Sequence, residues 1–332
     1  MRKFIQPNEK IFIAGANGMV GKAAKKSLLK FGYGIEENGG ALLTPLRNDL
    51  DLLNYEKVKN WFEINKPSIV ILAAAKVGGI HANNSQPTEF ILDNLKIQNN
   101  IIENAWKNGV KRLLFLGSSC IYPKFAKQPI TEDSLLTSSL EDTNQWYATA
   151  KIAGIKLCEA LRKQYNFDAI SLMPTNLYGP GDNYHPENSH VMAALIRKFY
   201  FAKQNTSKSV TCWGTGSPFR EFLYVNDLGD AIVFALEYWN PDYPNAPINE
   251  EGKPLTILNV GTGFDISIKD LANKIAKFTQ YEGEIIWDHS KPNGTPKKLL
   301  NIEKIKQLGW EPKTSLDVGL VKTINSFKKE NL

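Results

Sequence analysis

An apolar stretch near the start of the chain runs directly into a turn with three regularly spaced glycines. Residues 10–15 read Lys-Ile-Phe-Ile-Ala-Gly, Gly18 and Gly21 follow, and residues 20–31 have helical spacing. Glycines between a strand and a helix let the backbone approach a pyrophosphate, which amide groups at the helix N-terminus then bind. An ordinary turn can carry the same glycines. Their place in the first strand–helix unit favours a dinucleotide site, formed by Gly15, Asn17, Gly18, Met19, Val20 and Gly21.

Apolar stretches alternate with helical patterns through the first 180 residues. The predicted strands cover residues 10–15, 41–43, 67–73, 113–116 and 169–174, and the predicted helices cover 20–31, 54–65, 88–107 and 145–165. This alternation is typical of an α/β fold with a doubly wound parallel sheet, a Rossmann fold. In such a fold the ligand cleft lies at the carboxyl ends of the strands.

After residue 180 the alternation weakens, and we expect a smaller C-terminal substrate lobe that is discontinuous in the sequence. Loops, a helix near 190–204 and a strand at 209–213 interrupt the earlier pattern. The predicted division assigns residues 1–180 and 221–265 to the dinucleotide-binding Rossmann domain. The substrate-binding lobe takes residues 181–220 and 266–332.

Composition excludes several classes of protein. No apolar stretch approaches the ~20 residues of a membrane span. The net charge of +6 is mild and the lysines are scattered without interleaved aromatics, so we expect no nucleic-acid surface. Three cysteines, Cys120, Cys158 and Cys212, are too few and too scattered for a disulfide framework or a zinc site. We therefore expect that the protein binds no metal and is located in the reducing cytoplasm. Cys158 and Cys212 are expected to serve only in packing.

The end of the second predicted strand favours NADP(H) as the cofactor. An acid there binds the ribose hydroxyls of NAD, whereas an arginine accommodates the 2′-phosphate of NADP. Residues 39–46 contain no acid, and Arg47 follows them. Asp51 and Leu52 lie where a contact with adenine is plausible, although Asp51 is equally suited to capping the next helix.

Four reactive side chains follow two of the predicted elements. Ser118 and Cys120 lie two apart after the apolar strand at 113–116, so an extended backbone points both to one side. Tyr147 and Lys151 lie one helical turn apart. A nearby ammonium is expected to lower the pKa of the tyrosine, and a serine hydroxyl can polarise a carbonyl. The set predicts chemistry at a carbonyl group.

These residues lie within longer stretches that resemble the extended short-chain dehydrogenase/reductase family, in particular its members that epimerise and reduce GDP-4-keto-6-deoxy sugars. The matching stretches cover nearly the whole chain and include residues 72–80, 116–123, 173–180, 185–190, 220–222 and 291–298. The resemblance implies epimerisation of GDP-4-keto-6-deoxy-D-mannose at C3 and C5. NADPH-dependent reduction of the C4 ketone then gives GDP-L-fucose.

The resemblance also implies roles for individual residues. Ser118, Tyr147 and Lys151 would be the reductase triad, and Cys120 and His190 the acid/base pair for epimerisation. The alternative for Cys120 is a small buried packing residue, and the alternative for His190 is a helix cap. Further cofactor contacts are expected from Ala73, Ala74, Ala75, Lys151, Pro174, Asn176, Leu177 and His190. The expected substrate contacts are Lys76, Asn176, Arg197, Trp213, Arg220 and Lys298, with Trp213 equally suited to a core.

Two other functions are compatible with these motifs, and the resemblance also implies a homodimer. A reductase of a GDP-4-keto-6-deoxy-heptose in capsule or lipopolysaccharide synthesis would keep the same motifs, and a non-catalytic NADP sensor would keep the fold. Ala16 and Asn17 stand where the family often carries an arginine for the 2′-phosphate, which leaves Arg47 to favour NADP. The resemblance implies a homodimer through a four-helix bundle of the helices at 88–107 and 145–165.

Overall fold

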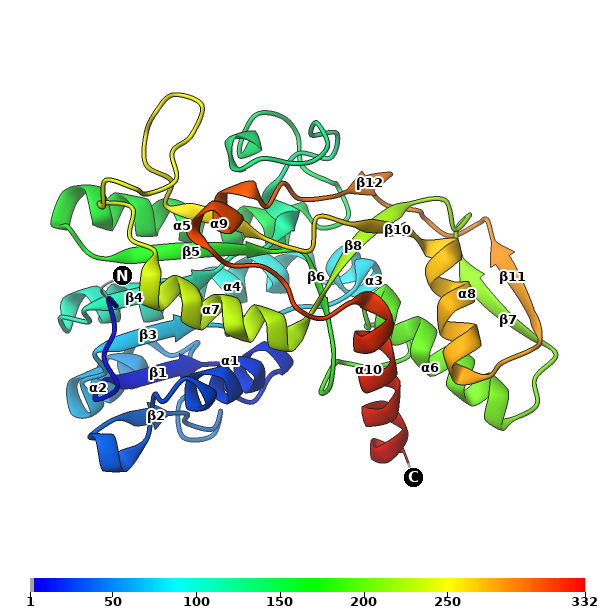
Figure 1. The fold of residues 1–332 in the computed structure, drawn as a ribbon, viewed down its shortest axis with the longest axis horizontal. Helices are drawn as coiled ribbons and strands as arrows, with labels where there is room; N and C mark the ends of the chain where they lie inside the picture. The colour runs from blue at the N-terminus through cyan, green and yellow to red at the C-terminus, as the bar shows by residue number, and fades with distance from the viewer. Residues whose placement is uncertain (1–2, 332) are drawn as a thin grey trace.

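The computed structural model describes residues 3–331, and within them a parallel sheet of six strands forms the centre of the larger domain (Figure 1). Its strands lie in the spatial order β2 (Ala41–Leu43), β1 (Lys10–Ala14), β3 (Ile69–Leu72), β4 (Arg112–Leu116), β5 (Ala169–Pro174) and β9 (Ile257–Val260). All neighbouring pairs are parallel. The strand order reverses between β1 and β3, where an open α/β sheet binds its ligand. The predicted doubly wound fold is confirmed.

Helices cover both faces of this sheet. α1 (Met19–Lys30) packs against α7 (Val225–Tyr238) on one face, while α2 (Tyr55–Asn65), α4 (Pro87–Lys107) and α5 (Gln145–Tyr165) pack together on the other (Figure 1). Every residue of β3, β4 and β5 is buried for this reason, which explains why these strands read as continuous apolar stretches. No helix within residues 3–331 combines the length and the apolar character that crossing a bilayer requires.

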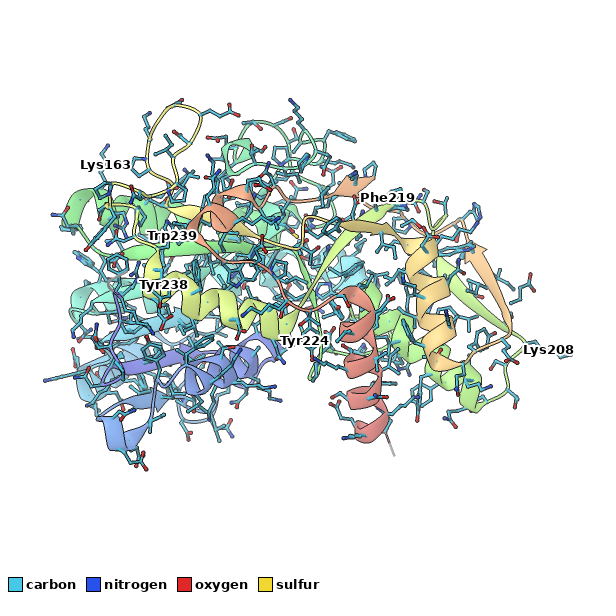
Figure 2. The ribbon with its side chains drawn as sticks, in the orientation of Figure 1. Lys163, Lys208, Phe219, Tyr224, Tyr238 and Trp239 are labelled. Atoms are coloured by element: carbon cyan, nitrogen blue, oxygen red, sulfur yellow. The ribbon has the colours of Figure 1, made fainter. Side chains whose placement is uncertain are left out.

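The smaller lobe has its own sheet and its own core. β8 (Phe219–Tyr224) pairs with β6 (Asn176–Tyr178), β10 (Asp265–Ser267) and β12 (Lys297–Lys298), and β7 (Ser209–Trp213) pairs with β11 (Glu284–Asp288). The lobe also contains α6 (Val191–Gln204), α8 (Ile268–Thr279) and α10 (Leu316–Glu330). Phe219 and Tyr224, labelled in Figure 2, mark the two ends of β8, and the strand passes from the exposed Phe219 to the buried Tyr224.

Short elements connect these layers. α3 (Ile80–Ser85) and α9 (Glu303–Leu308) are helices of six residues each. Three single-turn helices, η1 (Glu36–Asn38), η2 (Ser119–Ile121) and η3 (Glu132–Ser134), lie in loops. The strand β6 was not predicted, because three residues directly after β5 are too few to show alternation.

The predicted division between the domains is wrong at two places. β8 begins at Phe219 and belongs to the small sheet, although residues from 221 onward were assigned to the Rossmann domain. Conversely, Leu300, Ile302 and Ile305 lie in the larger core beside β9, although residues 266–332 were assigned to the smaller lobe. Apolar spacing shows that a segment is buried, but it does not show which of two cores buries it.

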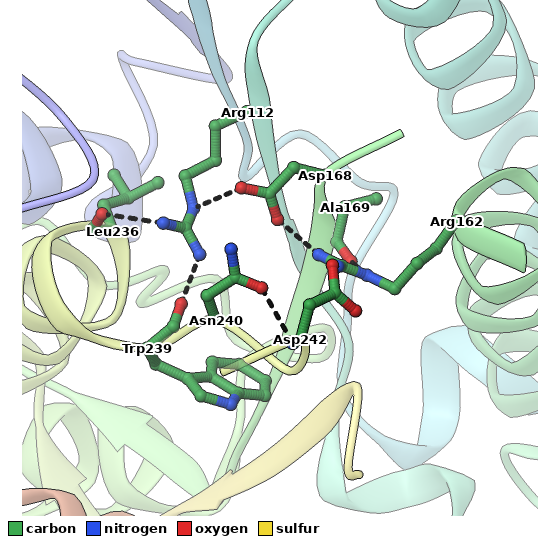
Figure 3. A network of polar contacts seen from close by, with 8 residues as sticks. All are labelled: Arg112, Arg162, Asp168, Ala169, Leu236, Trp239, Asn240 and Asp242. Atoms are coloured by element: carbon green, nitrogen blue, oxygen red, sulfur yellow. Dashed lines mark hydrogen bonds and ion pairs between the residues drawn. The ribbon is translucent and has the colours of Figure 1, made fainter. Parts of the chain in front are cut away.

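A buried network of charges joins the amino ends of β4 and β5 to the end of α7 (Figure 3). Arg112, which is 1 % exposed, donates to the carbonyl oxygens of Leu236 and Trp239 and lies 3.5 Å from the Asp168 carboxylate. Arg162 pairs with the same carboxylate. If Arg112 is removed, the carbonyl oxygens of Leu236 and Trp239 each lose a hydrogen bond, and the Asp168 carboxylate loses one of its two cations.

Replacing Arg112 with Met, which has a similar length and no charge, is expected to lower the free energy of unfolding. Two buried carbonyl oxygens lose their donor and Asp168 loses one cation, a loss of about 1–3 kcal/mol. The free energy of unfolding is measured by urea denaturation. Lys253→Met, which breaks the exposed pair with Glu251, is the matched control and should leave the unfolding midpoint unchanged. Equal midpoints for both variants would contradict this account of the network.

Candidate active site

A cavity of about 1140 Å³ opens at the carboxyl ends of the parallel strands and extends under the smaller lobe. Its walls include 23 of the 25 residues predicted to bind or to react; the exceptions are Gly21 and Arg197. The tertiary structure thus brings together residues that lie more than 280 positions apart in the sequence, from Gly15 to Lys298.

The glycine turn fits a diphosphate group. Gly15 has a φ of +87°, and a Cβ there would lie 2.8 Å from the backbone of Ala74. A Cβ at Gly21 would lie 2.1 Å from the carbonyl oxygen of Gly15, so Gly21 acts by close packing and not by contact with the cavity. Within residues 3–331, no side chain caps the first amide groups of α1, which begins after Gly18. Those amides remain available to an anion.

The end of β2 also faces the cavity. Arg47 is exposed on its wall, together with Asp51 and Leu52. Asp51 accepts a hydrogen bond from the amide of Leu53, whereas the cap of α2 is Asn54, which accepts from the amide of Lys57. The helix-capping alternative for Asp51 is therefore wrong.

Ser118, Tyr147 and Lys151 meet at the end of β4. Ser118 begins the turn η2, and its hydroxyl accepts a hydrogen bond from the amide of Cys120 at 3.2 Å. Lys151 is buried and donates to the carbonyl oxygen of Leu116 at 2.8 Å. Its Nζ lies 5.8 Å from the centre of the Tyr147 ring. Strand β4 and helix α5 thus hold the three side chains on one wall.

The protonation of this group differs from the prediction. Burial raises the pKa of Tyr147, and a hydrogen bond with Ser118 opposes this only in part. Burial lowers the pKa of Lys151 to about 7. Lys151, which donates to the Leu116 carbonyl, is not among the groups that shift the pKa of Tyr147, so the expected lowering by the ammonium is not seen among the described residues. At neutral pH the phenol holds its proton.

Cys120 and His190 face the same cavity from different elements. The sulfur of Cys120 lies 3.5 Å from the Asn144 amide nitrogen and 3.6 Å from Lys298 Nζ. His190 is the N-cap residue of α6, as the helix-cap alternative expected, but within the described residues its side chain makes no capping bond. The walls of the cleft, and then the charge of Lys298, lower the pKa of this solvent-accessible histidine.

The predicted substrate contacts lie on the wall formed by the smaller lobe. Arg220 donates to the carbonyl oxygens of Phe219 and Asn293, at 2.8 and 3.3 Å. Lys298 stands directly beside Arg220 on the paired strand β12. Trp213 is 47 % exposed, which argues against the core alternative.

Arg197 is a wrong prediction. Its guanidinium lies over the ring of Phe201, 5.4 Å from the ring centre, and it does not line the cavity. The neighbouring Lys198 lines it instead. One residue along an α-helix is a rotation of about 100°, so a shift of one position changes the face.

Asn144 and Lys198 also line the cavity, and neither was predicted. Asn144 lies three residues before Tyr147, a spacing that places both on one face of a helix and was available as a signal. Cys158 and Cys212 are buried at 2 % and 1 % exposure, as expected of packing residues, although Cys212 also borders the cavity.

Comparison with known proteins agrees with this geometry. Residues 11–249 match the NAD dependent epimerase/dehydratase family. The chain is 51 % identical over 320 residues to GDP-L-fucose synthase 1 of Arabidopsis thaliana, covering 96 % of this chain and 93 % of that protein.

Two solved structures are also similar. A GDP-6-OMe-4-keto-L-xylo-heptose reductase from C. jejuni has a TM-score of 0.89 and 34 % identity, covering 98 % of this chain and 99 % of the other. A GDP-L-fucose synthetase from Naegleria fowleri bound to NADP has a TM-score of 0.83 and 26 % identity, covering 98 % and 96 %.

Proposed function

We propose that this chain, which belongs to the NAD dependent epimerase/dehydratase family, converts GDP-4-keto-6-deoxy-D-mannose to GDP-L-fucose. The reaction comprises epimerisation at C3 and C5 followed by NADPH-dependent reduction at C4. The observation that carries the proposal is the convergence of Ser118, Tyr147, Cys120 and His190 on one cavity. The 51 % identity to a GDP-L-fucose synthase over nearly the whole chain supports the choice of sugar.

The cofactor side of the cavity suits NADP(H). The close-packed glycine turn and the free amides of α1 would hold the diphosphate, and Arg47 would face the 2′-phosphate. When bound, NADPH supplies the hydride for the C4 carbon. Lys151, which also lines the cavity, would contact the ribose.

The side chains of this chain account for the proton transfers. The hydrogens at C3 and C5 are acidic because the resulting anion delocalises onto the C4 oxygen, where Ser118 and Tyr147 would stabilise it. Inversion requires that a proton leaves one face of the sugar ring and returns to the other. Cys120 and His190, held by η2 and by the start of α6, would act as this pair. Tyr147, protonated at neutral pH, would finally donate its proton to the C4 oxygen.

One experiment tests the proposal directly. The purified protein is incubated with GDP-4-keto-6-deoxy-D-mannose and NADPH in D₂O, and the product is examined by mass spectrometry and NMR. We expect GDP-L-fucose with deuterium at C3 and C5. The structural similarity to a heptose reductase favours one rival, the reduction of a GDP-4-keto-heptose. Absence of turnover, or reduction without deuterium at these carbons, would decide for that rival.

We further propose a homodimer formed by α4 and α5. The two helices pack side by side, and Leu92 and Trp146 are 43 % and 41 % exposed on them. A second copy meeting the same face would bury both side chains in a four-helix bundle. Light scattering on the purified protein should give twice the mass of the chain, whereas a monomer mass would reject the assembly.

A further inference from the structure

The carboxylate of Glu221 joins its own strand, β8, to two other segments of the backbone. Glu221 lies on β8 and is fully buried. It accepts hydrogen bonds from the amides of Thr262 (2.6 Å), Gly263 (2.7 Å) and Leu300 (3.0 Å). Burial raises the pKa of this carboxyl group, and the three backbone bonds oppose the rise. A buried carboxylate with this number of donors acts as a fixed anchor for the loops that supply them.

The backbone of the same residue holds a fourth segment. The carbonyl oxygen of Glu221 accepts from the Asn176 side-chain amide at 2.9 Å and from the Thr175 hydroxyl at 3.3 Å. The turn after β9 is closed tightly around the carboxylate, since a Cβ at Gly261 would lie 2.3 Å from Glu221 Oε1. Glu221 therefore connects the ends of β5 and β9 in the larger sheet to β8 and to the segment after β12.

The segments joined by Glu221 carry the cations of the substrate wall. Arg220 precedes it on β8, and alternation along a strand directs Arg220 to the cavity while Glu221 points away. Lys298 pairs with Arg220 across β8 and β12, two residues before the anchored amide of Leu300. Lys298 Nζ also lies 3.6 Å from the Cys120 sulfur, so a shift of this segment moves a charge relative to a reactive group.

We propose that Glu221 is a positioning residue that sets Arg220 and Lys298 for the diphosphate of the nucleotide sugar. This proposal rests on the proposed function, because it takes the diphosphate of a GDP-sugar as the ligand of these cations. Glu221 does not touch the ligand. It acts by fixing the distance between β8 and β12, the two strands that carry Arg220 and Lys298.

Glu221→Gln tests the proposal, because it keeps the size of the side chain but places an amide NH₂ against backbone N–H donors. We expect the KM for the nucleotide sugar to rise about tenfold or more, as the loss of a charged hydrogen bond predicts. The kcat should change by less than about threefold, and the Kd for NADPH should not change. Glu237→Gln is the matched control: it is another buried carboxylate, bonded to Tyr33 and Lys3 far from the substrate wall. It should lower the melting temperature without changing the KM.

Direct binding of GDP, measured by calorimetry, separates this proposal from the proposed function. If wild-type protein binds no GDP, the proposed function fails. If wild-type protein binds GDP and E221Q binds it with unchanged affinity, or loses GDP and NADPH affinity equally, the positioning role is overturned. Should E221Q not fold, Gly261→Ala displaces the carboxylate without removing its charge, and the same split between GDP and NADPH affinity is expected.

Discussion

Replacing Tyr147 with Phe is expected to slow the reduction of the C4 ketone by about 10³-fold, within the range that general acid catalysis contributes. The phenol holds its proton at neutral pH because burial raises its pKa, and it lies on the cavity beside Ser118. Phenylalanine keeps the ring and removes only the proton donor. The rate is followed by NADPH oxidation, and the Kd for NADPH by its fluorescence.

The Kd for NADPH should remain unchanged in Y147F, which separates the loss of a proton donor from damage to the cofactor site. Tyr178→Phe is a suitable control, since Tyr178 is also buried but its hydroxyl bonds to the Leu316 carbonyl outside the cavity. We expect Y178F to retain the wild-type rate. Retention of the rate in Y147F itself would remove Tyr147 from the reaction and would assign the proton donation to another group.

Replacing Cys120 with Ser is expected to slow epimerisation by about 10²-fold or more, because a hydroxyl is a much weaker acid than a thiol. The thiol is partly exposed on the cavity and contacts Asn144 and Lys298, so the substitution keeps its shape and its neighbours. Incorporation of deuterium at C3 and C5 from D₂O measures the step directly. His190→Gln should show a comparable loss, since inversion needs a group on each face of the sugar.

The matched control for the thiol is Cys158→Ser, in the buried part of α5 and outside the cavity. It should leave deuterium incorporation unchanged even where the melting temperature falls. A GDP affinity equal to that of wild type should accompany the loss in C120S and H190Q. Wild-type incorporation of deuterium in either of these two variants would assign the epimerisation to other groups.

Much of the fold and of the reactive group was predictable because both depend on short-range patterns. Buried parallel strands read as continuous apolar stretches, and the helices at 88–107 and 145–165 were found almost to the residue as α4 and α5. The glycine turn and the spacing of Tyr147 and Lys151 are local as well. The substrate wall was predicted less well: Arg197 does not line the cavity, and the neighbouring Lys198, which does, was not predicted.

Short-range patterns along the chain were enough to predict the alternation of strands and helices, the parallel sheet that follows from it, and the residue types that meet at the end of β4. Periodicity and turn chemistry are encoded within a few residues and need no knowledge of distant contacts. Three features could be seen only once the chain was folded: which face of α6 reaches the cavity, that Lys151 bonds to the Leu116 carbonyl, and that residues 300–310 return to the larger core. These outcomes depend on the packing of segments that are far apart in the chain, and no local pattern records that packing.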